Sequence, residues 1–358
     1  MQAFIQRTAT GEPNVKEQCV WALGNIAGDS HFCRDYLLVA GAMELLLAEI
    51  MKPDVKPALQ KNIVWTISNL CRGKPSPDFT KIAPAIPILA SIIKSPDPNI
   101  VADACWALSY ISDGEEHRID TLLSHDVCET IVQLLINAPS PVQSPALRVL
   151  GNIVTGTDPQ TEKAISCGCL LALKHLLDTS GKKSIKREVC WTLSNITAGT
   201  PTQIQAALDA GVIESLVEQM KTADFDVRKE AAWAVANATS SGSTSQVHKL
   251  VDKGCILPLC ELVKAVDIKT VAVSLEAIDN ILKRGEEIRP LTTTGENPYV
   301  LVTEQCGGLE QLESLHNHAN ASIYLKAKKL LEKYFGLTED LEISEGNETV
   351  PFTDEYSI

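Results

Sequence analysis

Apolar residues recur along this chain at spacings of three and four, which is the spacing of one face of an α-helix. In one kind of segment these apolar positions, such as Leu23 and Ile26, alternate with a tryptophan and an asparagine, such as Trp21 and Asn25. Residues four apart share a helix face, so the tryptophan and the asparagine lie together, away from the apolar face. No strand-like alternation accompanies this pattern, which predicts an all-α protein.

The tryptophan segments return with a period of about 42 residues. They begin at Trp21, Trp65, Trp106, Trp191 and Trp233, which are all five tryptophans of the chain, and weaker copies in the same phase begin at Arg148 and Glu276. A shorter apolar segment recurs between them, for example at residues 168–173 and 211–217. Each unit should therefore hold two short helices, a turn and a third helix with the tryptophan. This period and content predict a right-handed superhelical solenoid of the armadillo/HEAT class.

The repeat organises almost the whole chain. We expect an array over residues 1–336, with about seven full units, a partial first unit and an atypical last one. The turn-prone residues 285–298 predict a long loop before the last unit. Residues 337–358 carry seven acidic side chains and no lysine or arginine. That composition predicts a disordered acidic tail.

The recurring tryptophan and asparagine predict a binding surface. In a single unit, a packed tryptophan and an asparagine that bonds the helix end would be the simpler interpretation. Repetition in successive units favours a shared function instead. Asparagine carboxamides can pair with the main chain of an extended peptide, and parallel indoles form slots for long cationic side chains. Asp103, Glu188 and Glu230 lie three residues before a tryptophan, on its face. An extended, lysine-rich peptide fits these three features.

Composition narrows the remaining classes of function. The chain has 32 Lys plus Arg against 45 Asp plus Glu, a net charge of −13, which favours basic ligands and disfavours nucleic acid. The sequence contains no run of about eighteen apolar residues and so predicts no membrane span. The 11 cysteines are scattered, and the closest pair, Cys167 and Cys169, has a spacing that suits no common metal or redox motif. We expect no metal, no cofactor and, in the absence of hydrolase, zinc-protease or phosphate-loop motifs, no catalytic residues.

Several segments resemble the armadillo repeats of the importin-α (karyopherin-α) family. They are residues 21–29, 65–72, 104–110, 145–156, 191–199 and 229–233, and the resemblance runs from residue 1 to about 336. The resemblance implies a nuclear import adaptor that binds classical basic nuclear localisation signals as extended peptides. It also implies that the protein shuttles between cytoplasm and nucleus.

The resemblance implies two peptide sites with a linker region between them. The matching part of the major groove consists of Trp21, Asn25, Asp29, Trp65, Asn69, Arg72 and Trp106, and Asp29 is the family's partner for the key lysine. The minor groove consists of Val154, Asp158, Thr161, Glu188, Trp191, Asn195, Glu230, Trp233 and Asn237. The linker region holds Tyr110, Arg148 and Asn152, where a phenol replaces asparagine and a cation replaces tryptophan. These two replacements interrupt the lysine slots.

The resemblance also implies further partners. The family meets the recycling exportin at its last repeat and nearby acidic region, and nucleoporins are further candidates. It recruits importin-β through a basic N-terminal segment, which is missing before Met1 together with roughly two repeats. We therefore expect a shortened chain that does not recruit importin-β through that segment.

Two alternatives stay open at this point. Another armadillo scaffold, of the β-catenin type, would have a basic groove that binds acidic peptides. A structural scaffold without peptide recognition would leave the common phase of the tryptophans unexplained. The charge of the groove distinguishes the first alternative from an importin-α-like function, because the carboxylates beside the indoles suit a basic peptide.

Overall fold

The computed structural model of the chain describes residues 1–337, and every regular element over this range is a helix. The prediction of an all-α fold is confirmed. The predicted acidic tail lies, apart from Leu337, outside the described residues. Among the helices described, none is both long and apolar enough to cross a bilayer.

The helices follow one another in groups of three. The chain begins with α1 (Gln2–Thr10) and α2 (Pro13–Asp29). Six groups follow: α3 (His31–Val39), α4 (Ala42–Ile50) and α5 (Pro57–Cys71); α6 (Phe79–Ile82), η1 (Ala83–Ala85), α7 (Ile86–Ile92) and α8 (Pro98–Ser112); α9 (Glu116–Leu123), α10 (Val127–Asn137) and α11 (Ser140–Ile153); α12 (Asp158–Ser166), α13 (Cys169–Thr179) and α14 (Lys183–Thr197); α15 (Pro201–Asp209), α16 (Val212–Thr222) and α17 (Phe225–Ser241); α18 (Thr244–Asp252), α19 (Ile256–Leu262) and α20 (Ile268–Ile288). After η2 (Arg289–Leu291), the last group has α21 (Pro298–Gln305), α22 (Gly308–Glu313), η3 (Ser314–Asn317) and α23 (Ala321–Phe335).

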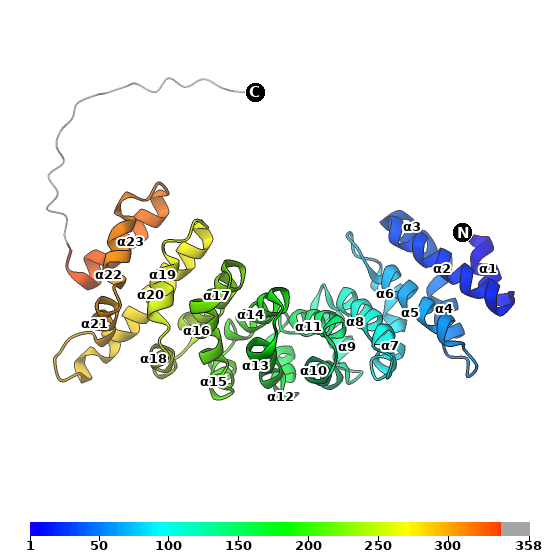
Figure 1. Ribbon diagram of the computed structural model, residues 1–358, viewed down its shortest axis with the longest axis horizontal. Coiled ribbons are helices and arrows are strands. Elements are labelled where there is room, and N and C mark those ends of the chain that lie inside the picture. Colours follow the sequence, from blue (N-terminus) through cyan, green and yellow to red (C-terminus); the bar gives the residue numbers. More distant parts are fainter. Residues whose placement is uncertain (338–358) are drawn as a thin grey trace, which may run out of the picture.

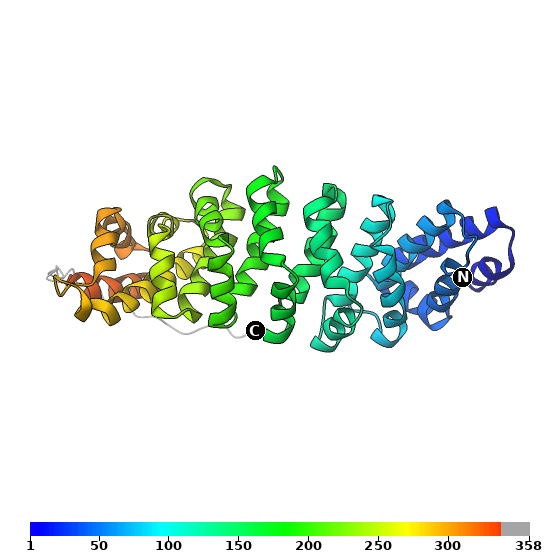
Figure 2. The same cartoon turned by 90° about the horizontal axis from the view of Figure 1, so that it is seen from below.

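The groups stack side by side into an elongated arc (Figure 1). In the middle of the arc, the third helices α8, α11, α14 and α17 run along the inner side, and the shorter helices α9, α10, α12, α13, α15 and α16 lie on the outer side. The view from below shows the same groups in a single row (Figure 2). Each tryptophan helix therefore neighbours the next along one continuous inner surface.

Local sequence explains how a unit turns between its two short helices. The residue at this corner is often a glycine in the left-handed region, as at Gly168 (φ 85°) and Gly211 (φ 72°). A side chain is strained in that conformation, so glycine allows the second helix to start directly after the first. Three of the first helices, α12, α15 and α18, begin with a capping box, for example Thr200 with Gln203.

The capping glutamines also join neighbouring units. The Nε2 atoms of Gln160, Gln203 and Gln246 donate to the carbonyl oxygens of Glu116 (3.0 Å), Asp158 (3.0 Å) and Pro201 (2.8 Å) of the preceding unit. All three glutamines are buried. Each hydrogen bond satisfies a buried amide and fixes one unit against the next, so the outer row of helices stacks with a defined register.

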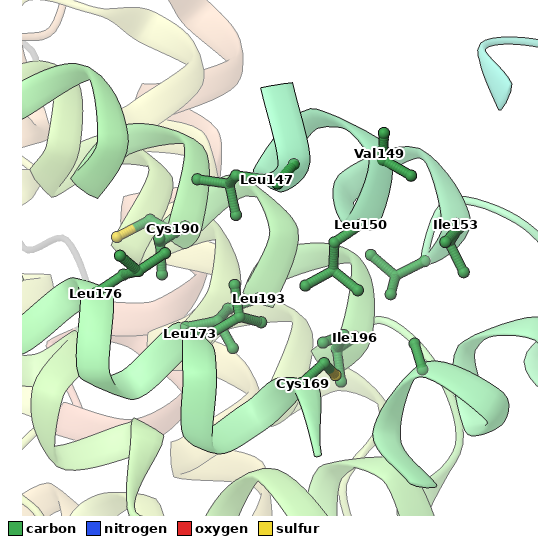
Figure 3. Close-up of a cluster of buried hydrophobic side chains, with 14 of the residues drawn as sticks. Leu147, Val149, Leu150, Ile153, Cys169, Leu173, Leu176, Cys190, Leu193 and Ile196 are labelled. Atoms are coloured by element: carbon green, nitrogen blue, oxygen red, sulfur yellow. The ribbon is translucent and has the colours of Figure 1, made fainter. Parts of the chain in front are cut away.

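One apolar core runs through all the groups. Figure 3 shows a section of it, where Leu147, Leu150 and Ile153 of α11 pack with Leu173 and Leu176 of α13 and with Leu193 and Ile196 of α14. These side chains belong to two successive units and are almost completely buried. A single unit would leave half of such a cluster in water, so the units stabilise one another by stacking.

The predicted loop at residues 285–298 is shorter than expected. Helix α20 continues through Gly285 to Ile288 instead of ending at the glycine. A Cβ on Gly285 would lie only 1.9 Å from the Oδ1 atom of Asn297. The Nδ2 atom of Asn297 donates to the carbonyl of Leu282 (2.8 Å). The glycine is therefore needed for this close approach and does not end the helix. After η2, only residues 292–297 connect α20 to the last group.

Candidate peptide-binding groove

All five tryptophans reach the surface of the third helices. Trp21, Trp106 and Trp233 are 51%, 37% and 40% exposed, and Trp65 and Trp191 are partly buried. The interpretation of these residues as ordinary core side chains is therefore wrong. The third helices follow one another along the array (Figure 1), and the tryptophans recur at one phase of the repeat, so the helix face that carries them is the candidate groove.

The asparagines of the ladder have a structural role that the sequence analysis set aside. The Nδ2 atoms of Asn69, Asn152 and Asn237 donate to carbonyl oxygens of the preceding tryptophan helix, at Gly24 (3.1 Å), Ser109 (2.8 Å) and Ser194 (2.9 Å). Each partner lies 43 to 45 residues earlier in the chain. These carboxamides therefore join the units. The Nδ2 atom of Asn152 also donates to Ser112 Oγ (3.1 Å), and Asn69 and Asn152 are buried, so of the three only Asn237, which is partly buried, has surface to offer a ligand.

The other two asparagines of the predicted sites differ from this pattern. Asn25 is exposed and donates to the carbonyl of Trp21 in its own helix (3.0 Å). Asn195 is half-buried, and its Nδ2 atom is buried without a hydrogen-bond partner among the described residues.

Three carboxylates precede a tryptophan by three residues on the same helix. Asp103, Glu188 and Glu230 are partly buried, and burial raises the pKa of all three carboxyls above the ordinary range. One oxygen of Glu188, Oε1, is buried without a hydrogen-bond partner among the described residues. A cation placed between these carboxylates would relieve the unfavourable burial of their charge.

The linker region contains the groove's own cation. The Arg148 guanidinium pairs with Glu188 (Nη2 to Oε2, 2.9 Å) and stacks over the Trp191 ring, 5.3 Å from its centroid. Tyr110 stacks on Trp106 with 6.0 Å between ring centroids. Arg148 therefore occupies one face of Trp191, and Tyr110 covers part of Trp106. This arrangement separates the indoles before the linker region from those after it.

The remaining predicted residues lie near the ends of the third helices. Asp29 and Arg72 are exposed at the ends of α2 and α5, and Asp158 is exposed at the start of α12. Val154 and Thr161, by contrast, are only 3% and 4% exposed. The Thr161 hydroxyl donates to the carbonyl of Val154 (3.4 Å) and closes the corner between α11 and α12. Their side chains offer almost no surface to a ligand.

Two glycines beneath the indoles escaped the sequence analysis. A Cβ on Gly24 would lie 2.3 Å from Cζ3 of Trp65, and one on Gly151 would lie 2.4 Å from Cζ3 of Trp191. These glycines directly precede Asn25 and Asn152 and lie three residues after Trp21 and Arg148, which hold the tryptophan position of their units. This fixed position in the repeat could have revealed them. Over the described residues, no group of three or more His, Cys, Asp or Glu side chains could hold a metal ion.

Comparison with known proteins gives a consistent result. The armadillo/beta-catenin-like repeat family matches residues 29–72, 77–113, 157–198 and 200–240, and the atypical Arm repeat family matches residues 297–351. Importin subunit alpha-1a of Oryza sativa subsp. japonica is 48% identical over 94% of this chain and 64% of its own length. Importin subunit alpha-8 of Arabidopsis thaliana is 36% identical over 92% of this chain and 73% of its own length. The chain thus spans somewhat less than two thirds of the rice relative.

A solved structure has a similar fold. It is a designed armadillo repeat protein in complex with the peptide (KR)4, with a TM-score of 0.61 and 31% sequence identity. The match covers 69% of this chain and 98% of that chain. The similarity supports the armadillo fold for the matched part of the chain.

Proposed function

The chain belongs to the importin-α family of armadillo-repeat proteins, and we propose that it is a non-enzymatic nuclear import adaptor that binds basic nuclear localisation signals as extended peptides in its inner groove. The observation that carries this proposal is the row of five exposed or half-exposed indoles, with partly buried carboxylates three residues before three of them. Aromatic faces and carboxylates together favour the aliphatic stem and the charged head of lysine and arginine. The designed protein with a similar fold binds a peptide of that composition.

The charge of the groove argues against the β-catenin-like alternative. An acidic peptide would need unpaired cations among the rungs, whereas Asp103, Glu188 and Glu230 flank the tryptophans. The cation at the centre of the row, Arg148, is already paired with Glu188. We therefore propose two sites for basic segments, the first around Trp21, Trp65 and Trp106 and the second around Trp191 and Trp233, with the linker of a bipartite signal between them.

A titration with two peptides tests the proposed function. We expect a fluorescent peptide of the type Pro-Lys-Lys-Lys-Arg-Lys to bind with about micromolar affinity or tighter, if several lysines each contribute about 1–2 kcal/mol. A control peptide with glutamate in place of each basic residue should not bind. Added salt should weaken the binding, because part of it is charge attraction. Preference for the acidic peptide would support the β-catenin-like alternative instead.

The buried carboxylates predict how this affinity depends on pH. Burial raises the pKa of Glu188, against the opposing effect of Arg148, and it also raises the pKa of Glu230. A lysine binds the charged form, so affinity should rise as the pH increases through these pKa values and level off above them. Titrations at a series of pH values should show this rise.

A matched variant tests whether these two carboxyls cause the pH dependence. The double substitution Glu188→Gln and Glu230→Gln cannot titrate, so its affinity for the lysine-rich peptide should be weaker at neutral pH and nearly independent of pH. If the double variant keeps the full pH dependence of the unsubstituted protein, other groups are responsible and the assignment is wrong.

Further partners are proposed from family membership. We propose that the last group, α21–α23, meets the recycling exportin, that nucleoporins bind the protein, and that it shuttles between cytoplasm and nucleus. Importin-β is proposed as a partner only of a chain that carries the family's basic N-terminal segment. Co-precipitation of the recycling exportin with and without α21–α23 would test the first of these proposals.

A further inference from the structure

The tryptophans of the groove fall into two classes by depth. Trp106 and Trp233 stand out at 37% and 40% exposure, whereas Trp65 and Trp191 are pressed further into the helix row. Each proposed site contains a more deeply packed indole followed by a more exposed one, Trp65 with Trp106 and Trp191 with Trp233, and the first site has the exposed Trp21 before this pair. The two sites therefore share the same order of a seated indole and a standing indole.

A glycine of the preceding helix lies beneath each seated indole. A Cβ at Gly24 would lie 2.3 Å from Cζ3 and 2.7 Å from Cε3 of Trp65. A Cβ at Gly151 would lie 2.4 Å from Cζ3 and 3.2 Å from Cε3 of Trp191. No side chain other than hydrogen fits at these distances, so the indole occupies the space that a side chain would fill.

Before each standing indole, a serine takes the place of this glycine in the preceding helix. At the corresponding position before Trp106 and Trp233, the preceding helices carry Ser68 and Ser194. Both serines are buried, and each hydroxyl donates to the tryptophan carbonyl of its own helix, at 2.8 Å for Ser68 to Trp65 and 2.8 Å for Ser194 to Trp191. A Cβ and a hydroxyl fill the space that glycine leaves open.

The residue after each tryptophan also differs between the two classes of indole. The seated indoles are followed by Thr66 and Thr192, and the standing indoles by Ala107 and Ala234, all of them buried. The hydroxyl of Thr66 donates to the carbonyl of Val20 in the preceding helix (3.0 Å) and lies 2.6 Å from the position of a Cβ on Gly24. The glycine therefore makes room for two side chains of the next helix.

We propose that Gly24 and Gly151 are positioning residues that hold the Trp65 and Trp191 indoles at a fixed depth and so set the shape of the lysine slot in each site. The effect on peptides rests on the proposed function, whereas the seating of the indoles does not. An indole packed against the helix backbone at the glycine is restricted before a ligand arrives, and such preorganisation lowers the cost of binding. The sequence pattern that marks a slot of this kind is Gly in one unit with Trp-Thr in the next.

The seating is tested in the free protein by its five indole N–H signals in a two-dimensional NMR spectrum, assigned with single Trp→Phe variants. Gly151→Ala should shift the Trp191 signal and leave that of Trp65 in place, and Gly24→Ala should do the reverse. Ser194→Ala is the matched control, because it keeps the Cβ and should leave the Trp233 signal nearly unchanged. A folded Gly151→Ala protein with an unmoved Trp191 signal would overturn the proposal.

The same spectra measure peptide binding site by site. With the lysine-rich peptide, Gly151→Ala should weaken binding at Trp191 and Trp233 by about tenfold and leave the Trp21 and Trp65 signals titrating as before. A displaced indole with unchanged affinity would refute the effect on the slot but not the seating. If the peptide shifts no indole signal in the unsubstituted protein, the proposed function fails while the seating result stands.

A double-mutant cycle keeps the proposal testable if Gly151→Ala lowers stability too far. Alanine is the better helix former, so without a steric conflict Gly151→Ala should raise the melting temperature. With the conflict it should lower it, and the loss should shrink in a Trp191→Phe background, where the Cζ3 and Cε3 atoms are removed. Equal losses in both backgrounds would show that the indole is not the obstacle and would overturn the proposal.

Discussion

Replacing Trp191 and Trp233 together by alanine is expected to weaken binding of a lysine-rich peptide at the second site by about 100-fold. Both indoles reach the groove surface, and partly buried carboxylates lie three residues before each of them. A desolvated cation over an indole contributes about 1–2 kcal/mol, so two lost indoles cost roughly 2–4 kcal/mol. Isothermal titration with a single-site peptide measures this loss directly.

A matched pair of substitutions separates groove chemistry from a general loss of apolar surface. Leu171 on α13 and Leu257 on α19 are exposed apolar residues on second helices, outside the tryptophan row. The double variant Leu171→Ala and Leu257→Ala should bind the peptide as tightly as the unsubstituted protein. If it loses as much affinity as the tryptophan variant, or if the tryptophan variant keeps its affinity, the second site does not lie where we place it.

The fold could be predicted in large part because its information is local and repeated. Helical spacing of apolar residues and a period of about 42 residues are enough to predict three-helix units that stack. The resemblance to importin-α, which rests on the residues of the repeated segments, is also confirmed. The prediction failed at Gly285, where α20 continues. The cause is a contact with Asn297, twelve residues away, which gives a glycine inside a helix a packing role that no helix-ending rule anticipates.

The candidate site was harder to predict because its details depend on neighbouring units. That the indoles avoid the core follows from their position on the helix, and their exposure agrees with it. The second role of the asparagines does not follow in this way, since the carbonyl that accepts from Asn237 belongs to Ser194, in the unit before. The same holds for Gly151, whose importance lies in an indole of the next helix. Periodicity within one helix predicts a face, but the distances between helices require the stacked array.

Reversing the charge of Asp29 is expected to weaken peptide binding at the first site by about 100-fold. Asp29 is exposed at the end of α2, one turn beyond Asn25 on the tryptophan helix. In Asp29→Lys, a bound lysine would lose an attractive partner and meet a like charge, which costs several kcal/mol at short range. Titration of a peptide with a single basic cluster, at low and at moderate salt, measures the effect.

The control is Asp209→Lys, which changes the net charge of the protein by the same amount. Asp209 is exposed at the end of α15, one of the outer helices, far along the chain from the first site. If only a uniform attraction between an acidic protein and a basic peptide acted, the two variants would bind the peptide with equally reduced affinity. Moderate salt would then make both affinities equal to that of the unsubstituted protein. A specific lysine position at Asp29 requires Asp29→Lys to remain much weaker than Asp209→Lys when the salt concentration is raised, because a contact at short range is screened less than the field of the whole molecule.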